Sequence, residues 1–196
     1  MAGWTTHTGQ AIALPLENVD TDQLIPARFM SIPRSEGYGG HLLHDMRRNA
    51  DGELDTAFPL NRWPEASILI ARRNFGSGSS REAAVYALVD AGYRAVIAPS
   101  FGDIFAGNAV NNGLLPAQVS ESEVERLISS VPTDLSVDLE ACTVRIGGAD
   151  VPFSLADTAR TKLMNGWDDI DLTRAEAEHI KGYRDALMQA RPWVWA

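Results

Sequence analysis

The chain is poor in cysteine: Cys142 is the only one among 196 residues. One thiol cannot form an internal disulfide, and an iron–sulfur cluster is usually ligated by several cysteines. We therefore expect no disulfide, and no metal or cluster held by this chain alone. Cys142 falls in a stretch where apolar and polar residues alternate, so we expect it to be a core residue.

Basic residues are also scarce, since 17 Lys and Arg stand against 26 Asp and Glu and give a net charge of −9. This balance argues against nucleic acid or an anionic membrane as a partner. No apolar run approaches a membrane span, and residues 1–5 lack the parts of a signal peptide. We expect a cytoplasmic protein, for which small anionic ligands stay possible because a local group of arginines can override the net charge.

The most informative stretch is a glycine–serine segment that runs from Asn74 to Glu82. An apolar run at residues 66–71 precedes it and predicts a buried strand, and apolar residues at helical spacing follow it over residues 84–91. Strand, loop and helix start form an anion site in many proteins, because glycines allow close approach and first-turn amides attract negative charge.

The side chains of this segment suit the same purpose. Arg81 carries a planar fork that matches a carboxylate or phosphate, and Ser79 and Ser80 place hydroxyls near the helix start. The segment is not a P-loop, because no Lys-Ser/Thr pair follows Gly78. It is not a dinucleotide fingerprint either, because Arg81 stands where a third glycine is needed. A simple helix cap formed by Ser79 or Ser80 is the alternative interpretation.

The rest of the chain predicts an α/β fold with a mixed sheet. Apolar runs at 94–99 and 114–119 follow helical stretches, which is typical of parallel βαβ units, and residues 11–14 form another candidate strand. A capping box at 120–123 predicts a helix, and a second one at Thr173–Glu176 predicts a C-terminal helix over 173–190. Alternating segments at 135–139, 142–146 and 151–155, with a turn at Gly147 and Gly148, predict antiparallel strands.

Residues 30–63 form a long irregular region with few apolar anchors, which we expect to be mobile or poorly packed. His41 and His44 within it could form a metal pair, but a solvated helix turn is the preferred interpretation. Asp20 and Asp22 could be an acid–base pair, although such clusters more often shape a loop. Trp193 and Trp195 in the tail are apolar enough to dock onto a partner subunit.

Several motifs in order give the chain a family resemblance over nearly its whole length. They are Asn18–Asp22 with Ile25-Pro26, Asn74–Glu82, Val96–Phe101 with Asp103–Phe105 and Gly107-Asn108, then Asn112, Leu114–Pro116 and Met164–Gly166. With these residues the chain resembles the small subunits of isopropylmalate isomerase (3-isopropylmalate dehydratase). The resemblance implies a single domain over residues 1–196 of the aconitase swivelling type, with β/β/α layers, a mixed parallel and antiparallel sheet and a C-terminal helix.

The resemblance also implies a reaction and a partner. Members interconvert 2- and 3-isopropylmalate in leucine biosynthesis by removing and adding water, together with a large aconitase-like subunit that carries a [4Fe–4S] cluster. By this likeness Ser79 is the catalytic base. The substrate, a small dicarboxylate, is expected to be bound by Arg81 together with Ser80, Gly78, Arg34 and Arg28.

The chain departs from the family pattern at three places. Ala83 stands where members usually have His, and Ser77 stands where Cys or Thr is common. In the loop of residues 29–43, Ser35 and Glu36 replace a usual Arg and Thr, with Arg34 one place away. Because this loop is thought to cover the variable side of the substrate, a related hydro-lyase for another substituted malate, such as citramalate or dimethylmalate, is an alternative. A second and less favoured alternative is a non-catalytic module, in which the same glycine–serine segment binds a carboxylate ligand.

Overall fold

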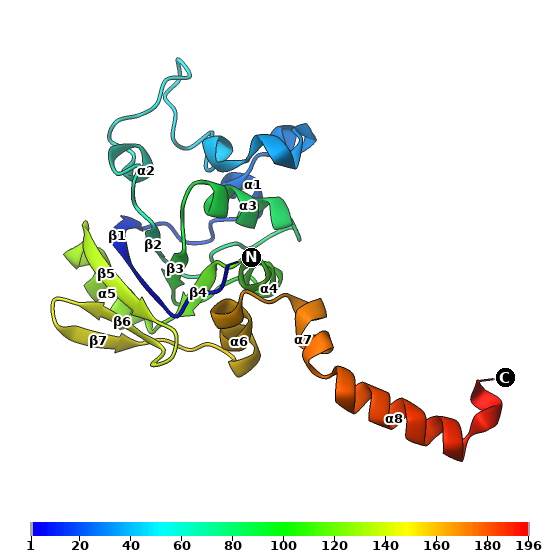
Figure 1. The fold of residues 1–196 in the computed structure, drawn as a ribbon. Helices are drawn as coiled ribbons and strands as arrows, with labels where there is room; N and C mark the ends of the chain where they lie inside the picture. Colours follow the sequence, from blue (N-terminus) through cyan, green and yellow to red (C-terminus); the bar gives the residue numbers. More distant parts are fainter. Residues whose placement is uncertain (1, 196) are drawn as a thin grey trace.

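The structure, a computed structural model, describes residues 2–195 and is built around one seven-stranded sheet (Figure 1). The strand order is β4-β3-β2-β1-β5-β6-β7. The first four strands are parallel and the last three are antiparallel to their neighbours, so the expected mixed sheet is confirmed. The strands are β1 (Thr6–Leu14), β2 (Ile68–Ala71), β3 (Ala95–Ala98), β4 (Leu115–Gln118), β5 (Thr133–Asp138), β6 (Thr143–Ile146) and β7 (Ala149–Pro152).

Apolar side chains cover both faces of the parallel part of the sheet. In β2, Leu69 packs into one core, while Ile68 and Ile70 pack into a second core on the opposite face. The first core holds helices α3 (Glu82–Asp90) and α4 (Asp103–Asn111), and the second holds α5 (Glu121–Ser130). Burial on both sides explains why β2 and β3 are continuous apolar runs in the sequence.

The antiparallel part has the alternation that the sequence predicts. Leu135 and Val137 of β5 are buried while their neighbours are not, and Gly147 and Gly148 link β6 to β7 as a hairpin. Cys142 is half-buried and packs at the edge of the second core, as expected. It lies just before β6, in the antiparallel part of the sheet and outside the glycine–serine segment.

Short helical turns fill the region between β1 and β2. They are α1 (Thr21–Leu24), η1 (Ala27–Ser31), η2 (Arg34–Glu36), η3 (Gly39–His41) and α2 (Pro59–Arg62). The expectation of poor packing at 30–63 is wrong for much of this region, because Tyr38, Leu42, Leu43 and Leu60 are buried in the first core. Residues 49–57 are exposed.

His41 and His44 do not form the solvated helix turn that the sequence favoured. Both rings pack on Phe29, with centroid distances of 4.2 and 4.6 Å. Burial, followed by the nearby His44 and Arg48, lowers the pKa of His41. No group of three or more His, Cys, Asp and Glu side chains within residues 2–195 is arranged to hold a metal ion.

The C-terminal helix begins earlier than predicted and is broken in two. Asp168 caps α7 (Asp169–Ala175), since its carboxylate accepts hydrogen bonds from the amides of Ile170 and Asp171 at 2.8 and 2.9 Å. Thr173, the predicted cap, lies inside α7, and the chain breaks at Glu176 before α8 (Ala177–Ala190) and η4 (Pro192–Val194). Another helix, α6 (Asp157–Asn165), was not predicted.

The last elements project from the body of the molecule as an extended arm, which ends far from the sheet (Figure 1). We call α7, α8 and η4 together the C-terminal arm. Among the described helices, none is long and apolar enough to cross a membrane.

Candidate active site

The glycine–serine segment is held in place by tight backbone packing at Gly76. The φ of Gly76 is +72°, and a Cβ there would lie 2.2 Å from Cγ of Phe105 in α4. Gly102, just before α4, fits equally closely, since its Cβ would lie 2.5 Å from the carbonyl oxygen of Gly76. Only glycine meets both demands, so the ring of Phe105 fixes the path of the chain towards Ser79.

A second segment, residues 18–23, is remote in sequence and forms hydrogen bonds with the glycine–serine segment. The amide and the hydroxyl of buried Thr21 donate to the carbonyl oxygens of Ser77 and Ser79, both at 2.9 Å. The side-chain amide of Asn74 donates to Asn18 at 2.8 Å. Asp20 caps α1 in a capping box with Gln23, so the expected loop-shaping role of Asp20 is confirmed. Residues 18–23 therefore set the position of the serine carbonyls.

The reactive groups of the loop lie at the start of α3. Ser79 and Ser80 precede the helix and are exposed, and neither caps it, because the N-cap residue is Arg81. No side chain within the described residues caps this helix end. First-turn amides without a cap, together with the positive end of the helix dipole, stabilise negative charge. The simple-cap interpretation of the two serines is wrong.

Arg81 already contacts a carboxylate in this structure. Its guanidinium forms an ion pair with Asp22, which follows the loop-supporting Thr21. The Arg81 side chain is 22% exposed and that of Asp22 is 56% exposed, so solvent reaches the pair mainly from the Asp22 side. The ion pair shows that the Arg81 guanidinium can bind a carboxylate at this position.

Arg34 lies at the other end of α3 from the serines. It forms a bidentate ion pair with Asp90 at 2.6 and 2.8 Å, and its guanidinium lies 4.4 Å from the ring centroid of Tyr86. Asp90 lies eight positions after Glu82 along α3, and at the helical rise per residue this corresponds to about 12 Å. The structure therefore does not bring Arg34 to the serine loop.

Arg28 is likewise engaged elsewhere. It pairs with Asp45 and lies 4.5 Å from the ring centroid of Phe29. The hydrogen bond from Arg28, with a second from His44, lowers the pKa of Asp45 to about 2. Of the residues predicted to bind substrate, the structure groups Gly78, Ser80 and Arg81 around Ser79, and places Arg28 and Arg34 in other contacts.

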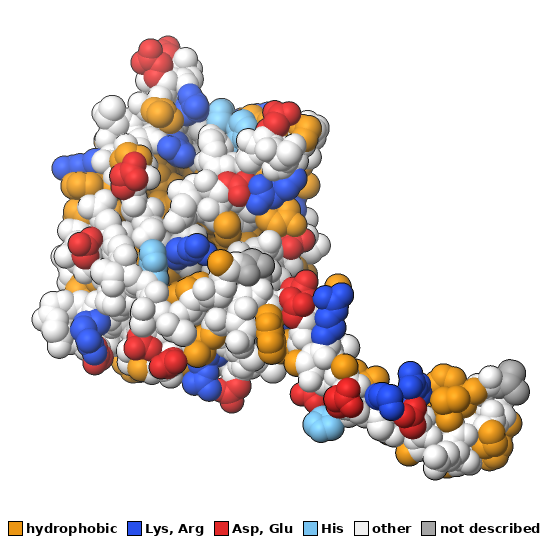
Figure 2. Space-filling model, viewed as in Figure 1, with side chains coloured by type: hydrophobic (Ala, Val, Ile, Leu, Met, Phe, Trp, Pro, Cys, Tyr) orange, Lys and Arg blue, Asp and Glu red, His pale blue; other side chains and the backbone are white. Residues whose placement is uncertain are grey.

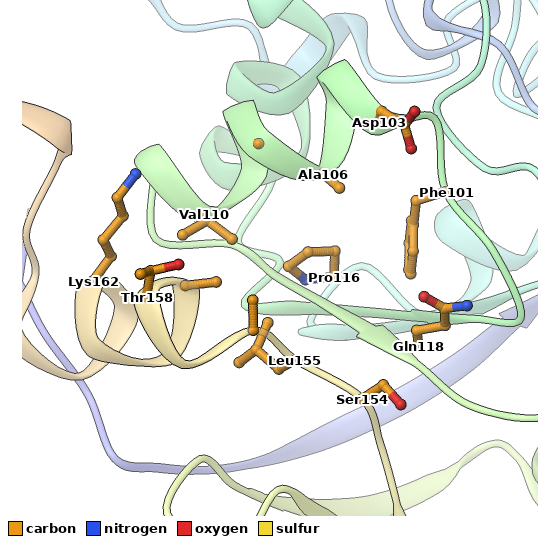
Figure 3. A pocket seen from close by; sticks show the side chains of 13 residues that line it. Phe101, Asp103, Ala106, Val110, Pro116, Gln118, Ser154, Leu155, Thr158 and Lys162 are labelled. Atoms are coloured by element: carbon orange, nitrogen blue, oxygen red, sulfur yellow. The ribbon is translucent and has the colours of Figure 1, made fainter.

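A cavity of about 370 Å³ lies between α4, β4 and α6, lined by residues such as Phe101, Asp103 and Lys162 (Figure 3). None of its lining residues belongs to the segment from Gly76 to Arg81. The amine of Lys162 donates to Asn111 at 2.9 Å and pairs with Asp169. The charge of Lys162 is therefore neutralised by Asp169. Because the cavity lining includes no residue of the serine loop, the two features are separate.

The sequence did not single out Thr21, and it offered Asp22 as a possible acid–base or loop-shaping residue rather than as the partner of Arg81. The signal was present, because both lie in the motif that carries the family resemblance. What the sequence alone could not give is the contact, since more than 50 residues separate Asp22 from Arg81.

Comparisons with known proteins show the family to which the chain belongs. A profile of the family described as aconitase C-terminal domain matches residues 1–122. Proteins named 3-isopropylmalate dehydratase small subunit, from Shewanella baltica strain OS185 and Shewanella oneidensis, are each 47% identical over 196 residues, covering 95% of this chain and 98% of the relative. A crystal structure of 3-isopropylmalate dehydratase from Methanocaldococcus jannaschii has a TM-score of 0.67 at 26% identity, covering 90% of this chain and 99% of that one.

Proposed function

The chain belongs to the aconitase C-terminal domain family as a small subunit of 3-isopropylmalate dehydratase, and we propose that Ser79 is its catalytic base and Arg81 its carboxylate clamp. The enzyme is a hydro-lyase of leucine biosynthesis. One observation carries the proposal: an exposed serine pair lies at an uncapped helix start, beside an arginine that already holds a carboxylate.

The base must take a proton from the carbon next to the carbon that bears the hydroxyl group. A serine hydroxyl is a poor base in water, because its alkoxide is costly. At the start of α3 the first-turn amides and the Arg81 cation stabilise both the alkoxide of Ser79 and the negative charge that develops on the substrate. The electron pair of the broken C–H bond becomes the second bond between the two carbons. In the hydration direction, Ser79 returns the proton.

Departure of the hydroxyl as water is assigned to the large subunit. The donors of this chain do not fit a [4Fe–4S] cluster, since its one cysteine, Cys142, is half-buried at the far side of the sheet from the serine loop. The proposal therefore places the cluster on the large subunit, which the small-subunit identity implies as a partner. This chain supplies the base and part of the substrate-binding surface.

Arg81 would bind a substrate carboxylate in place of Asp22, or its guanidinium would donate hydrogen bonds to the substrate carboxylate and to Asp22 at the same time. Ser80 and Gly78 would complete the pocket wall, because they flank Ser79 on the exposed side of the loop. Substrate contacts by Arg28 and Arg34 stay predictions, and both would require these arginines to leave their aspartate partners. The cytoplasmic location also stays a prediction.

A paralogous substrate is the second candidate, favoured by one observation. The loop that departs from the family pattern at Ser35 and Glu36 is anchored through Arg34 to Asp90, so Arg34 is not free to replace the missing arginine. The variable side of the substrate would then meet a different surface, and another substituted malate would fit the same proton chemistry.

The base assignment is tested by Ser79→Ala in the chain reconstituted with its large subunit. Loss of a general base costs about 10²- to 10⁴-fold in turnover. The matched control is Ser77→Ala, whose contact with Thr21 runs through the backbone and survives the change. Full activity of Ser79→Ala in an intact complex would refute the assignment.

A further inference from the structure

The C-terminal arm exposes an apolar face that its own body does not cover. No residue of α8, all of which the structure describes, is buried. Tyr183 is 71% exposed and Ile180 is 50% exposed, and Trp193 in η4 is 71% exposed. In Figure 2 apolar side chains gather towards the free end of the arm. An exposed apolar patch of this kind marks an interaction surface.

The face has the geometry of a docking element. Ala177, Ile180, Tyr183 and Leu187 recur at helical spacing along one side of α8. At the elbow between α7 and α8 lies a hollow of about 560 Å³, lined by Ile170, Ala177 and Ile180 with Asp169, Arg174, Lys181 and Arg184 around them. Asp185 pairs with both Lys181 and Arg184, so a partner that fits this hollow presents an apolar side chain to Ile170 and Ile180.

The root of the arm lies beside the proposed active site. Glu82, which follows Arg81, accepts a hydrogen bond from Asn112 at 2.8 Å. The adjacent Asn111 donates to Asp169, the first residue of α7, at 3.2 Å. The end of α4 therefore contacts both the start of α3 and the start of the arm. A chain that closes over Ser79 and Arg81 has only to extend past this point to reach α8.

We propose that the C-terminal arm is a docking arm for the large subunit, an apolar surface of which covers the Ile180 face and the elbow. The inference rests on the proposed function, because that function places a large subunit over Ser79. A second copy of this chain is the competing occupant. The continuity with the active-site face favours the large subunit, and two copies that each carry a net charge of −9 repel one another overall.

The test measures the affinity of the full chain for the large subunit. Ile180→Glu places a charge in the apolar face while keeping a good helix former, and we expect the dissociation constant to rise at least tenfold. The matched control is Gln189→Glu, which adds the same charge on the opposite side of α8 by the helical repeat. We expect the control to stay within twofold of the unchanged chain.

Three readouts separate the possible outcomes. Turnover at saturating large subunit should be unchanged in Ile180→Glu, whereas Ser79→Ala should lose turnover and keep affinity. Unchanged affinity of Ile180→Glu would overturn the docking arm. So would sedimentation of the lone chain as a dimer that Ile180→Glu dissociates. If the native pair binds through Ile180 yet converts no isopropylmalate, the proposed function fails while the docking arm stands.

Discussion

The guanidinium of Arg81 holds a carboxylate before any substrate arrives, because Asp22 occupies it. Replacement by lysine keeps the positive charge and removes the fork that suits a carboxylate. We expect Arg81→Lys in the reconstituted enzyme to raise KM about tenfold or more, since hydrogen bonds to charged groups contribute about 1.5–3 kcal/mol. Steady-state kinetics on 3-isopropylmalate measure this effect.

Arg73→Lys is the matched control for that substitution. Arg73 pairs with exposed Glu17 and is itself 57% exposed, so the substitution Arg73→Lys should leave KM unchanged. A KM that does not move in Arg81→Lys would show that the carboxylate is bound elsewhere.

Gly76 tests the packing that directs the loop. A methyl group at Gly76 would collide with the ring of Phe105 at a backbone φ that favours glycine. We expect Gly76→Ala to lower the free energy of unfolding by about 1–3 kcal/mol, measured by urea denaturation. Gly107→Ala in α4 meets no atom within 4 Å and should stabilise the chain by about 0.5–1 kcal/mol. Equal stability of the two variants would contradict this account of the loop.

Among individual residues, the sequence predicted the loop members but not the contacts of Thr21 and Asp22 that support them. Ser79 and Arg81 stood out because strand, glycine and helix signals are local in sequence. Thr21 and Asp22 belong to another segment, and only the parallel packing of β1 beside β2 brings the two segments together. Arg34 was predicted near the substrate by loop resemblance, whereas its carboxylate partner on α3 is a tertiary contact that no local pattern reveals.

At the scale of elements, one carboxylate at the end of α3 links this helix to the region before β2. Asp90 accepts hydrogen bonds from both terminal nitrogens of the Arg34 guanidinium, and from the amide of Tyr38 at 2.7 Å. We expect Asp90→Ala to destabilise the fold by about 1 kcal/mol and to speed hydrogen exchange at the Tyr38 amide. Exchange in β2 should rise only as far as this loss of global stability requires, and less than exchange at Tyr38. Asp150→Ala, which breaks an exposed hairpin pair with Arg145, should leave Tyr38 unaffected.

Hydrogen exchange in the native chain also tests the mobility predicted for residues 30–63. Burial of Leu42, Leu43 and Leu60 predicts protection around these residues, with fast exchange confined to 49–57. Fast exchange throughout the region would contradict the packing seen here.

β1 carries a histidine that makes stability depend on pH. Burial, followed by the charge of Arg94, lowers the pKa of His7 below 6.5, and its ring hydrogen-bonds Ser67 at 2.8 Å. As the pH falls below about 6.5, the unfolded chain binds the proton first, so the free energy of unfolding decreases until the folded pKa is passed. Urea denaturation at pH 7.5 and 5.5 should show this loss. His7→Gln should show a smaller one, and an equal loss would contradict the assignment.

Helix ends were the elements that the sequence predicted least well. Two neighbouring patterns, at Asp168–Asp171 and at Thr173–Glu176, both resemble capping boxes, and the first one forms. At α5 only half of the predicted box forms, because Ser120 caps the helix while Glu123 accepts a hydrogen bond from Arg126. Helix α6 has no capping side chain and buries few residues, which left its signal weak. The parallel strands β2 and β3 were predicted well because burial on both faces requires continuous apolar runs. The antiparallel strands were predicted from the alternation that one exposed face produces.

At the scale of the whole molecule, the proposed function gives this chain one half of a catalytic centre. The proposed base and clamp lie on the body, from which the C-terminal arm projects, and the remaining chemistry is assigned to a partner (Figure 1). We propose that the loop around Arg34 affects which substituted malate is accepted, since Ser35 and Glu36 differ there from the family pattern while Ser79, Arg81 and Glu82 keep it.

We expect this chain, with its large subunit, to interconvert 2- and 3-isopropylmalate. The direct measurement is kcat/KM of the reconstituted pair on 3-isopropylmalate, citramalate and dimethylmalate, with Ser79→Ala in parallel. The highest kcat/KM is expected for 3-isopropylmalate, and Ser79→Ala should lose it. Turnover of a non-isopropyl malate alone, or undiminished turnover by Ser79→Ala, would contradict this expectation.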